Sequence, residues 1–152
     1  MRTLTHACDF TVPAPPERVF PLLCPVREYD WIPPWQGELL HSVSGVAEED
    51  CVFRTAVPSG DGSMTWVVSR YEPPLRIEFT CFLPDFYVFR LKIALTASAG
   101  ATRLDWTRRW LAGGSRGEAW LAGQSEVEQR KMIDTLRQLL THYLATGRML
   151  RP

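Results

Sequence analysis

The first residues of the chain alternate between apolar and polar side chains. One parity of residues 3–12 carries the apolar side chains and one histidine: Leu4, His6, Cys8, Phe10 and Val12. A period of two places successive side chains on opposite faces of a strand. The pattern therefore predicts a strand over residues 3–12 with one buried face.

A proline-rich segment follows this strand. Pro15 and Pro16 suit a helix start, where a missing N–H costs nothing, and an apolar face follows at residues 19–23. Pro21 removes a hydrogen bond inside that helix, so we expect the helix to be short or kinked. A second helical turn is predicted from Val26 to Trp31, ended by Pro33 and Pro34.

The middle of the chain reads as strands and turns. Candidate strands cover residues 38–43, 51–57, 64–71, 75–82, 86–97 and 102–111. The segment 58–62, Pro-Ser-Gly-Asp-Gly, is rich in residues that tolerate positive φ and predicts a hairpin turn. Short connections of this kind favour an antiparallel meander.

The end of the chain changes to a helical period. Apolar residues recur at steps of three and four, which predicts one long helix over residues 116–146 that stops at Gly147. Its inner stripe is apolar in the second half: Met132, Leu136, Leu139, Leu140 and Tyr143. Continued backwards, the stripe becomes Gln129, Ser125, Ala122 and Glu118, side chains that either face a space or are simply solvated.

Together these elements predict an α+β fold. We expect a seven-stranded antiparallel sheet wrapped around a long C-terminal helix, with two short helices between the first and second strands. The 152 residues suit a single domain, 1–152.

Composition narrows the possible partners. The 17 basic and 17 acidic residues cancel, so charge gives no reason to expect nucleic acid. No apolar run suits a membrane span or a signal peptide, which favours a cytoplasmic protein.

The cysteines at 8, 24, 51 and 81 form no Cys-x-x-Cys pair and are expected to be reduced. His6, Cys8 and His41 lack metal-ligand spacing, so we expect neither metal nor cofactor.

Three segments resemble the START-like, helix-grip superfamily, which includes polyketide cyclases, START lipid-transfer domains, birch-pollen-allergen relatives and heat-shock ATPase activators. They are Val12–Phe20 with the following Trp31, Tyr71–Phe79 with its Pro-Pro turn, and Ala99–Leu104 with its Gly-Ala-Thr turn. The resemblance covers essentially the whole chain. It implies a cavity between the sheet and the long helix.

Strand parity then nominates residues that line this cavity. From the strands these are His6, Trp66, Phe79, Tyr87, Phe89, Leu91, Trp106, Arg108 and Trp110. The helix would add Ser125 and Gln129, and the proline-rich segment would place Trp31 and Trp35 at the rim. Core packing remains the alternative for the aromatic residues, above all for Tyr87.

Arg108 is the most notable of these candidates. A buried guanidinium is costly unless it is paired, so an inward Arg108 needs an anion from the protein or from a ligand. The alternative is a bulge that turns both Arg108 and Arg109 to water. His6, on the neighbouring strand by resemblance, is either a hydrogen-bonded wall residue or a catalyst.

No catalytic motif decides between functions. The chain has no Gly-x-Ser-x-Gly elbow, no His-Glu-x-x-His and no phosphate-binding glycine loop, so catalytic residues stay unknown. The sequence favours binding of a small hydrophobic, lipid-like or polyketide-like molecule by a monomer or homodimer. One alternative is a cyclase or dehydratase-like enzyme that uses His6, Arg108 and a tyrosine. The other is a protein-interaction module resembling the chaperone-ATPase activators.

Overall fold

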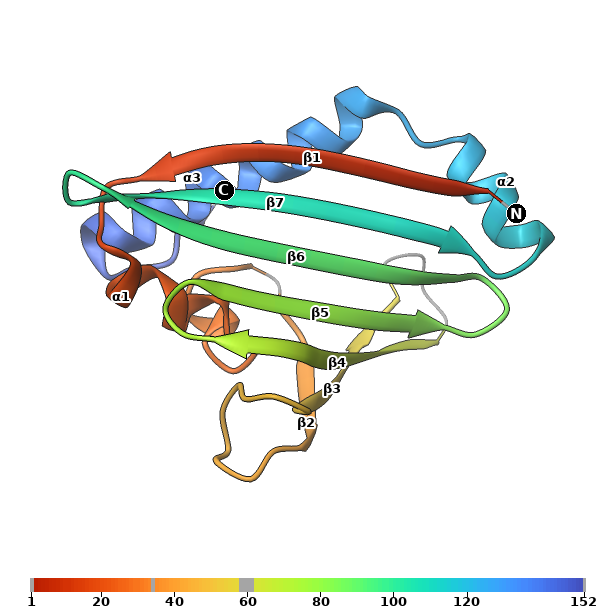
Figure 1. Ribbon diagram of the computed structural model, residues 1–152, viewed down its shortest axis with the longest axis horizontal. Coiled ribbons are helices and arrows are strands. Elements are labelled where there is room, and N and C mark those ends of the chain that lie inside the picture. Colours follow the sequence, from red (N-terminus) through yellow and green to blue (C-terminus); the bar gives the residue numbers. More distant parts are fainter. Residues whose placement is uncertain (1, 34, 58–61, 152) are drawn as a thin grey trace.

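A curved, seven-stranded antiparallel sheet forms most of the molecule (Figure 1). The computed structural model describes residues 2–33, 35–57 and 62–151. The strands are β1 (Thr3–Val12), β2 (Gly37–His41), β3 (Val52–Ala56), β4 (Ser63–Glu72), β5 (Arg76–Leu83), β6 (Tyr87–Ser98) and β7 (Ala101–Ala112). Their order across the sheet is β1-β7-β6-β5-β4-β3-β2, so the first strand joins the last and the rest form the expected meander.

Short helical turns connect β1 to β2. They are the α-helix α1 (Pro16–Val19) and the 3₁₀ helices η1 (Phe20–Leu23) and η2 (Glu28–Asp30). The missing N–H of Pro21 ends the α-helix after one turn and the chain tightens into η1, which confirms the prediction of a short first helix. The predicted hairpin turn at 58–62 and the stop at Pro34 fall largely outside the described residues, which exclude 58–61 and 34.

The long helix predicted over 116–146 is wrong in one respect. Two helices occupy this stretch, α2 (Ser115–Ala122) and α3 (Glu126–Thr146), separated at residues 123–125. Gly123 ends α2, and the Ser125 side chain accepts a hydrogen bond from the Glu128 N–H and caps α3. Ser125 and Glu128 have the spacing of a capping box, a start signal inside the apparent period. The predicted stop is confirmed, since Gly147 is left-handed and its N–H bonds the Tyr143 carbonyl.

Strand parity correctly predicts which side chains face inward on β1, β5, β6 and β7. His6 is paired with Arg108 across β1 and β7, and neither β7 ladder shows a register shift there. The alternative of a bulge that turns Arg108 to water is therefore wrong. Its neighbour Arg109, on the outer face, is exposed.

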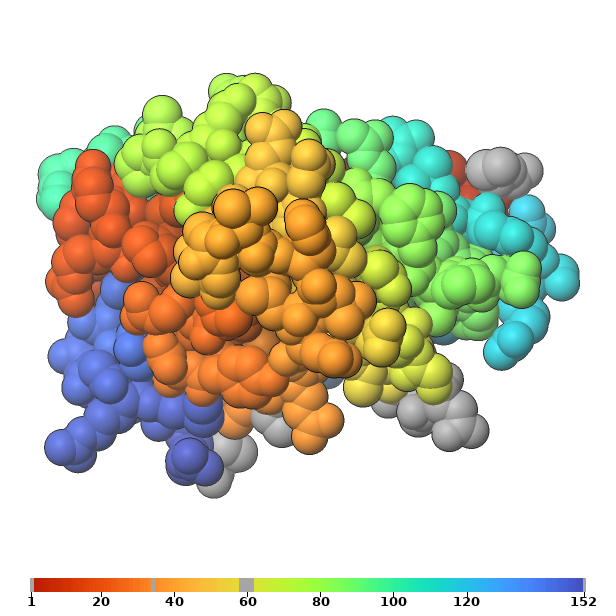
Figure 2. Space-filling model, turned by 90° about the horizontal axis from the view of Figure 1, so that it is seen from below, coloured from red at the N-terminus to blue at the C-terminus, as the bar shows by residue number. Residues whose placement is uncertain are grey.

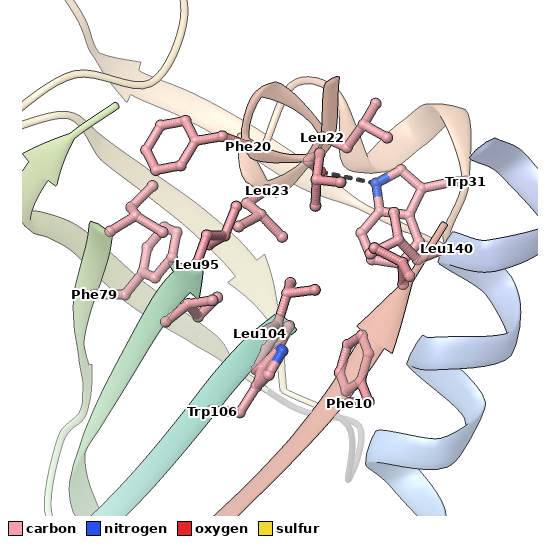
Figure 3. Packing of buried hydrophobic residues seen from close by; sticks show 14 of the residues in the cluster. Phe10, Phe20, Leu22, Leu23, Trp31, Phe79, Leu95, Leu104, Trp106 and Leu140 are labelled. Atoms are coloured by element: carbon pink, nitrogen blue, oxygen red, sulfur yellow. Dashed lines mark hydrogen bonds between the residues drawn. The ribbon is translucent and has the colours of Figure 1, made fainter. Parts of the chain in front are cut away.

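The main core lies between the sheet, the helical turns after β1 and the second half of α3 (Figure 3). Trp31 is almost fully buried there and donates from Nε1 to the Leu22 carbonyl at 2.8 Å. A second cluster, centred on Trp110 and Phe89, lies under α2. Arg18 donates to the Leu144 carbonyl, which ties α1 to the end of α3. Figure 2 shows the orange segment after η2 beside the blue end of α3.

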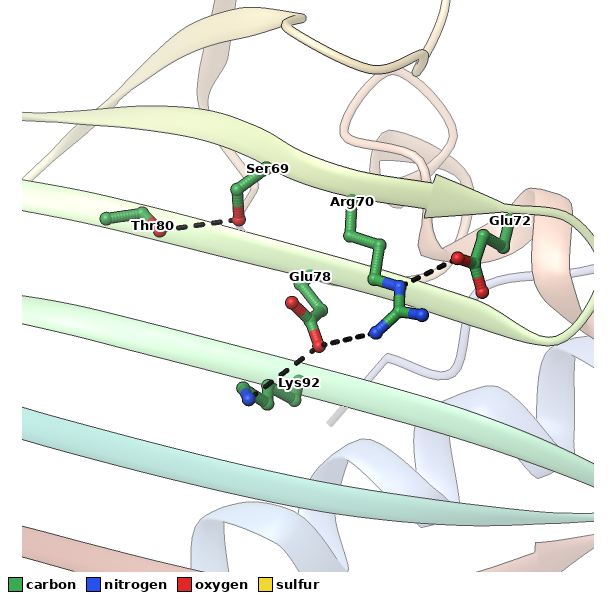
Figure 4. A network of polar contacts seen from close by, with 6 residues as sticks. All are labelled: Ser69, Arg70, Glu72, Glu78, Thr80 and Lys92. Atoms are coloured by element: carbon green, nitrogen blue, oxygen red, sulfur yellow. Dashed lines mark hydrogen bonds and ion pairs between the residues drawn. The ribbon is translucent and has the colours of Figure 1, made fainter.

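The outer face of the sheet carries charged side chains instead. Arg70 contacts both Glu72 and Glu78, and Lys92 reaches Glu78 from the next strand (Figure 4). Exposed ion pairs of this kind contribute little each, about 0–1 kcal/mol. The inner face, which buries its side chains, is therefore where the fold gains its stability.

Close packing of α2 on the turn between β5 and β6 gives a first testable prediction. A Cβ at Gly117 would lie 1.8 Å from the Phe86 carbonyl oxygen, whereas at Gly123 it would meet nothing closer than 3.6 Å. We expect Gly117→Ala to lower the free energy of unfolding by about 2 kcal/mol or more. Gly123→Ala should be close to neutral. Urea denaturation of the two variants measures the difference, and equal effects would contradict this packing.

Candidate functional site

A cavity of about 670 Å³ opens between the inner face of the sheet, the η2 segment and α3. Its walls come from three places. The sheet contributes Phe53, Thr55, Ala56, Met64, Trp66, Phe79, Phe89, Leu91, Ile93, Trp106 and Arg108; the η2 segment contributes Glu28, Trp31, Ile32, Trp35 and Gln36; α3 contributes Met132 and Leu136; and Val57 follows β3. Gln36 and Ala56 are exposed and mark the mouth.

Two tryptophans of the η2 segment are fixed by their own indole N–H groups. Trp31 Nε1 donates to the Leu22 carbonyl at 2.8 Å, and Trp35 Nε1 donates to the Pro25 carbonyl at 2.9 Å. Both acceptors belong to the turns just before η2. The segment therefore folds back on itself and presents two satisfied indole rings, an apolar surface, to the cavity.

The opposite wall is an array of aromatic rings on β3 to β6. Trp66 stacks on Phe53 at 5.7 Å between centroids and meets Phe89 edge-on at 5.6 Å. Its indole N–H is satisfied by the Thr55 hydroxyl at 2.9 Å. Rings that hold each other in these geometries form a stiff apolar surface with few polar groups.

Arg108 is the one cationic side chain among the described residues that line the cavity, and it is 1% exposed. Its Nη2 lies 2.9 Å from His6 Nδ1 and donates to the Gln129 carbonyl at 3.0 Å. Its Nη1 contacts the Met132 sulfur at 3.6 Å, and its Cζ lies 5.5 Å from the Trp110 ring centroid. All of these partners are neutral. No carboxylate of the described residues lies within ion-pair distance of it.

Burial lowers the pKa of Arg108 to about 10, which still leaves the guanidinium charged at neutral pH. Burial and the charge of Arg108 both lower the pKa of His6, so the imidazole is neutral. Because a guanidinium can only donate, His6 Nδ1 must accept and Nε2 must carry the proton. His6 therefore holds Arg108 in place and does not share its charge.

Glu28 is the one carboxyl among the described residues that line the cavity. It is half-buried, and desolvation raises the pKa of its carboxyl to about 8. At neutral pH the group is largely protonated and cannot balance the charge of Arg108. Its neighbours Tyr29 and Asp30 are exposed instead.

The nominated residues divide into two groups. Those that line the cavity are Trp31, Trp35, Trp66, Phe79, Phe89, Leu91, Trp106 and Arg108. Tyr87 and Trp110 instead belong to the cluster under α2, where Trp120 also lies, so their nomination as lining residues is wrong. His6 and Gln129 lie behind Arg108 and contact it.

Ser125 is also a correction. It is exposed and caps α3, so the first half of the predicted helix does not face the cavity. The cavity borders the middle of α3 instead, at Met132 and Leu136 of the apolar stripe. The polar lining residues Glu28, Gln36 and Thr55 were missed, because their place in the cavity depends on how the η2 segment and β3 fold over the sheet. Only the alternation along β3 could have indicated Thr55.

The family profile described as polyketide cyclase / dehydrase and lipid transport matches residues 4–141. The chain belongs to this family. A search of the curated proteins returned no match.

Several solved structures share the fold of this chain. MLL2253 from Mesorhizobium loti is 18% identical, with a TM-score of 0.65 over 91% of this chain and 98% of that one. Ara h 8.0201 is 16% identical, with a TM-score of 0.68 over 95% and 99%. These two structures confirm the predicted fold, and the family profile supports the resemblance from which it was expected.

DynU16, a protein of the dynemicin biosynthetic locus, is 25% identical with a TM-score of 0.61. The match covers 95% of this chain but only 48% of DynU16, so the chain spans about half of that protein's length.

The raised pKa of Glu28 predicts a pH-dependent stability. The folded state keeps a proton that the unfolded state releases near pH 4.5, so stability should fall as pH rises from about 4.5 to about 8. Glu28→Gln mimics the protonated carboxyl and removes this loss. Its melting temperature should match the wild type near pH 4.5 and exceed it increasingly up to pH 8. A difference that does not change with pH, measured by circular dichroism, would contradict the assignment.

Proposed function

We propose that the chain binds a small hydrophobic molecule, lipid-like or polyketide-like, inside this cavity. The observation that carries the proposal is the cavity itself. Its volume of about 670 Å³ lies within the range of roughly 300–1,000 Å³ found for small-molecule sites. Its walls are mostly aromatic and aliphatic, with few polar groups, as in sites that bury most of their ligand.

The shape of the cavity favours an elongated or planar ligand. Its walls extend across four strand spacings, from Arg108 on β7 to Thr55 on β3, which is roughly 19 Å measured along the curved sheet. The flat faces of Trp66 and Phe89 suit fused aromatic rings, which stack or meet them edge-on. Membership of a polyketide cyclase, dehydrase and lipid-transport family supports this ligand class, as does the origin of DynU16 in a biosynthetic locus.

A cyclase or dehydratase-like enzyme remains the second candidate. Arg108 can polarise a carbonyl, and the protonated Glu28 can supply a proton in the same cavity. The tyrosine expected for this chemistry is missing from the described lining, since Tyr87 lies under α2. The protein-interaction module is less supported than the enzyme, because a cavity lies between the sheet and α3.

Kinetic measurements distinguish the enzyme from the carrier. For an enzyme, Arg108→Ala or Glu28→Gln should lower turnover of a poly-β-ketone substrate more than its affinity. For a carrier, both variants should change affinity alone, and no turnover should be detected.

Filling the cavity tests the binding proposal. Leu91 lines the cavity in the middle of β6, and the adjacent Arg90 is exposed on the other face. We expect Leu91→Trp to weaken binding of the neutral fluorescent probe N-phenyl-1-naphthylamine at least tenfold, because the new indole occupies its space. Arg90→Trp, the matched control, should leave binding unchanged. Fluorescence titration measures both, and equal affinities for the two variants would contradict binding in the cavity.

A further inference from the structure

The buried polar atoms that lack a partner all belong to one cluster. Among the described residues they are His6 Nε2, Trp106 Nε1, Arg108 Nε and Gln129 Oε1. Buried polar groups without a partner are rare and costly. Here all of them belong to Arg108, to its contacts His6 and Gln129, and to Trp106, the neighbouring inward residue on β7.

The unpartnered atoms are mostly donors. Arg108 Nε and Trp106 Nε1 carry hydrogen in every state, and His6 Nε2 carries it because Nδ1 accepts from Arg108. Arg108 and Trp106 both line the cavity, and their Cα atoms lie about 7 Å apart along one face of β7. Two residues of the cavity wall therefore each carry an enclosed donor without a partner, and one of these donors is charged.

The charge at this place is not balanced within the described part of the cavity. Glu28 is the one carboxyl there and is largely protonated at neutral pH. Arg108 is held by a neutral imidazole, a backbone carbonyl, a thioether and an indole ring. A buried cation with only neutral partners is stabilised by an anion that shares its environment.

From this cluster we infer that Arg108 and Trp106 receive an ionised oxygen of the bound molecule, so that the ligand is a hydrophobic weak acid held as its anion. This inference rests on the proposed function, because it names the ligand class of the same cavity. His6 is a positioning residue, since it orients Arg108 from behind the wall. The ionised oxygen belongs to a carboxylate or to a phenolate, and both make the same charge-assisted hydrogen bonds.

The test uses two probes with the same ring system, 2-naphthoate and its neutral methyl ester, in calorimetric titrations of the full chain at pH 7. The wild type should prefer the carboxylate. Arg108→Met should weaken 2-naphthoate roughly 10- to 100-fold, the usual effect of losing hydrogen bonds to a charged group, and leave the ester within about threefold. Phe89→Leu is the control for general damage to the cavity, and it should weaken both probes alike.

The outcomes separate the two proposals. If Arg108→Met affects both probes equally, or neither, the anion site is wrong while binding in the cavity stands. If the wild type prefers the ester, the anion site is likewise wrong. If neither probe binds the wild type, the proposed function fails, and the anion site fails with it.

Stability provides a second readout that a purely structural arginine would not give. Replacing a buried charge that lacks an ionic partner is often neutral or stabilising, so ligand-free Arg108→Met should melt at or above the wild-type temperature. If Arg108→Met does not fold, Arg108→Lys decides. It keeps the charge and should retain a preference for the carboxylate, and a lysine variant without that preference would overturn the inference.

A third probe, 2-naphthol, distinguishes the two sources of the ionised oxygen. Bound as a phenolate it must release a proton, which appears as a dependence of the binding enthalpy on the ionisation enthalpy of the buffer. Proton release that is lost in Arg108→Met extends the site to phenolates. No release, together with a retained preference for 2-naphthoate, supports a site for carboxylates.

Discussion

A guanidinium buried among neutral partners is the constraint on which the site depends. Arg108 is placed inward by the unbroken register of β7 with β1 and β6, so the sheet cannot turn it to water without losing ladder hydrogen bonds. Its contacts with His6 and the Gln129 carbonyl connect β1, β7 and the start of α3 around one charge. The fold thus fixes a cation in a wall that is otherwise apolar.

The other described residues that line the cavity do not balance the charge of Arg108. Trp31 and Trp35 satisfy their N–H groups on nearby carbonyls and turn only ring faces inward. Trp66 does the same through Thr55. Glu28 lies in the lining, but desolvation keeps it protonated at neutral pH. Under the proposed function, this cavity discriminates between ligands of similar size by their charge, since apolar contact alone separates them weakly.

Much of this arrangement could be predicted from the sequence, because a strand period of two is a strong local signal. Parity nominated His6, Trp106 and Arg108 as inward, but for Arg108 it left open a bulge that would turn the side chain to water. The break between α2 and α3 could not be predicted in this way, because the helical spacing of the apolar second half can be continued backwards through Ser125. The Ser125–Glu128 capping spacing was present but was outweighed by that period. Ser125 was therefore assigned to the cavity, although it caps a helix.

Residues set by tertiary packing could not be predicted in the same way. Trp110 and Tyr87 have the correct parity, yet α2 covers them, and nothing local to β6 or β7 indicates where α2 packs. Glu28 lies in a polar turn by sequence and enters the lining only because η2 folds over the sheet. Parity predicts which face a side chain occupies, whereas the helices decide whether that face is core or cavity.

The central claim is that the cavity holds a molecule whose ionised oxygen pairs with Arg108. A crystal structure of the protein with 2-naphthoate bound tests it most directly. The account predicts the naphthalene ring between Trp66 and the η2 segment, with a carboxylate oxygen roughly 2.7–2.9 Å from a nitrogen of Arg108. A carboxylate at the mouth beside Gln36, or a ligand bound outside the cavity, would contradict it.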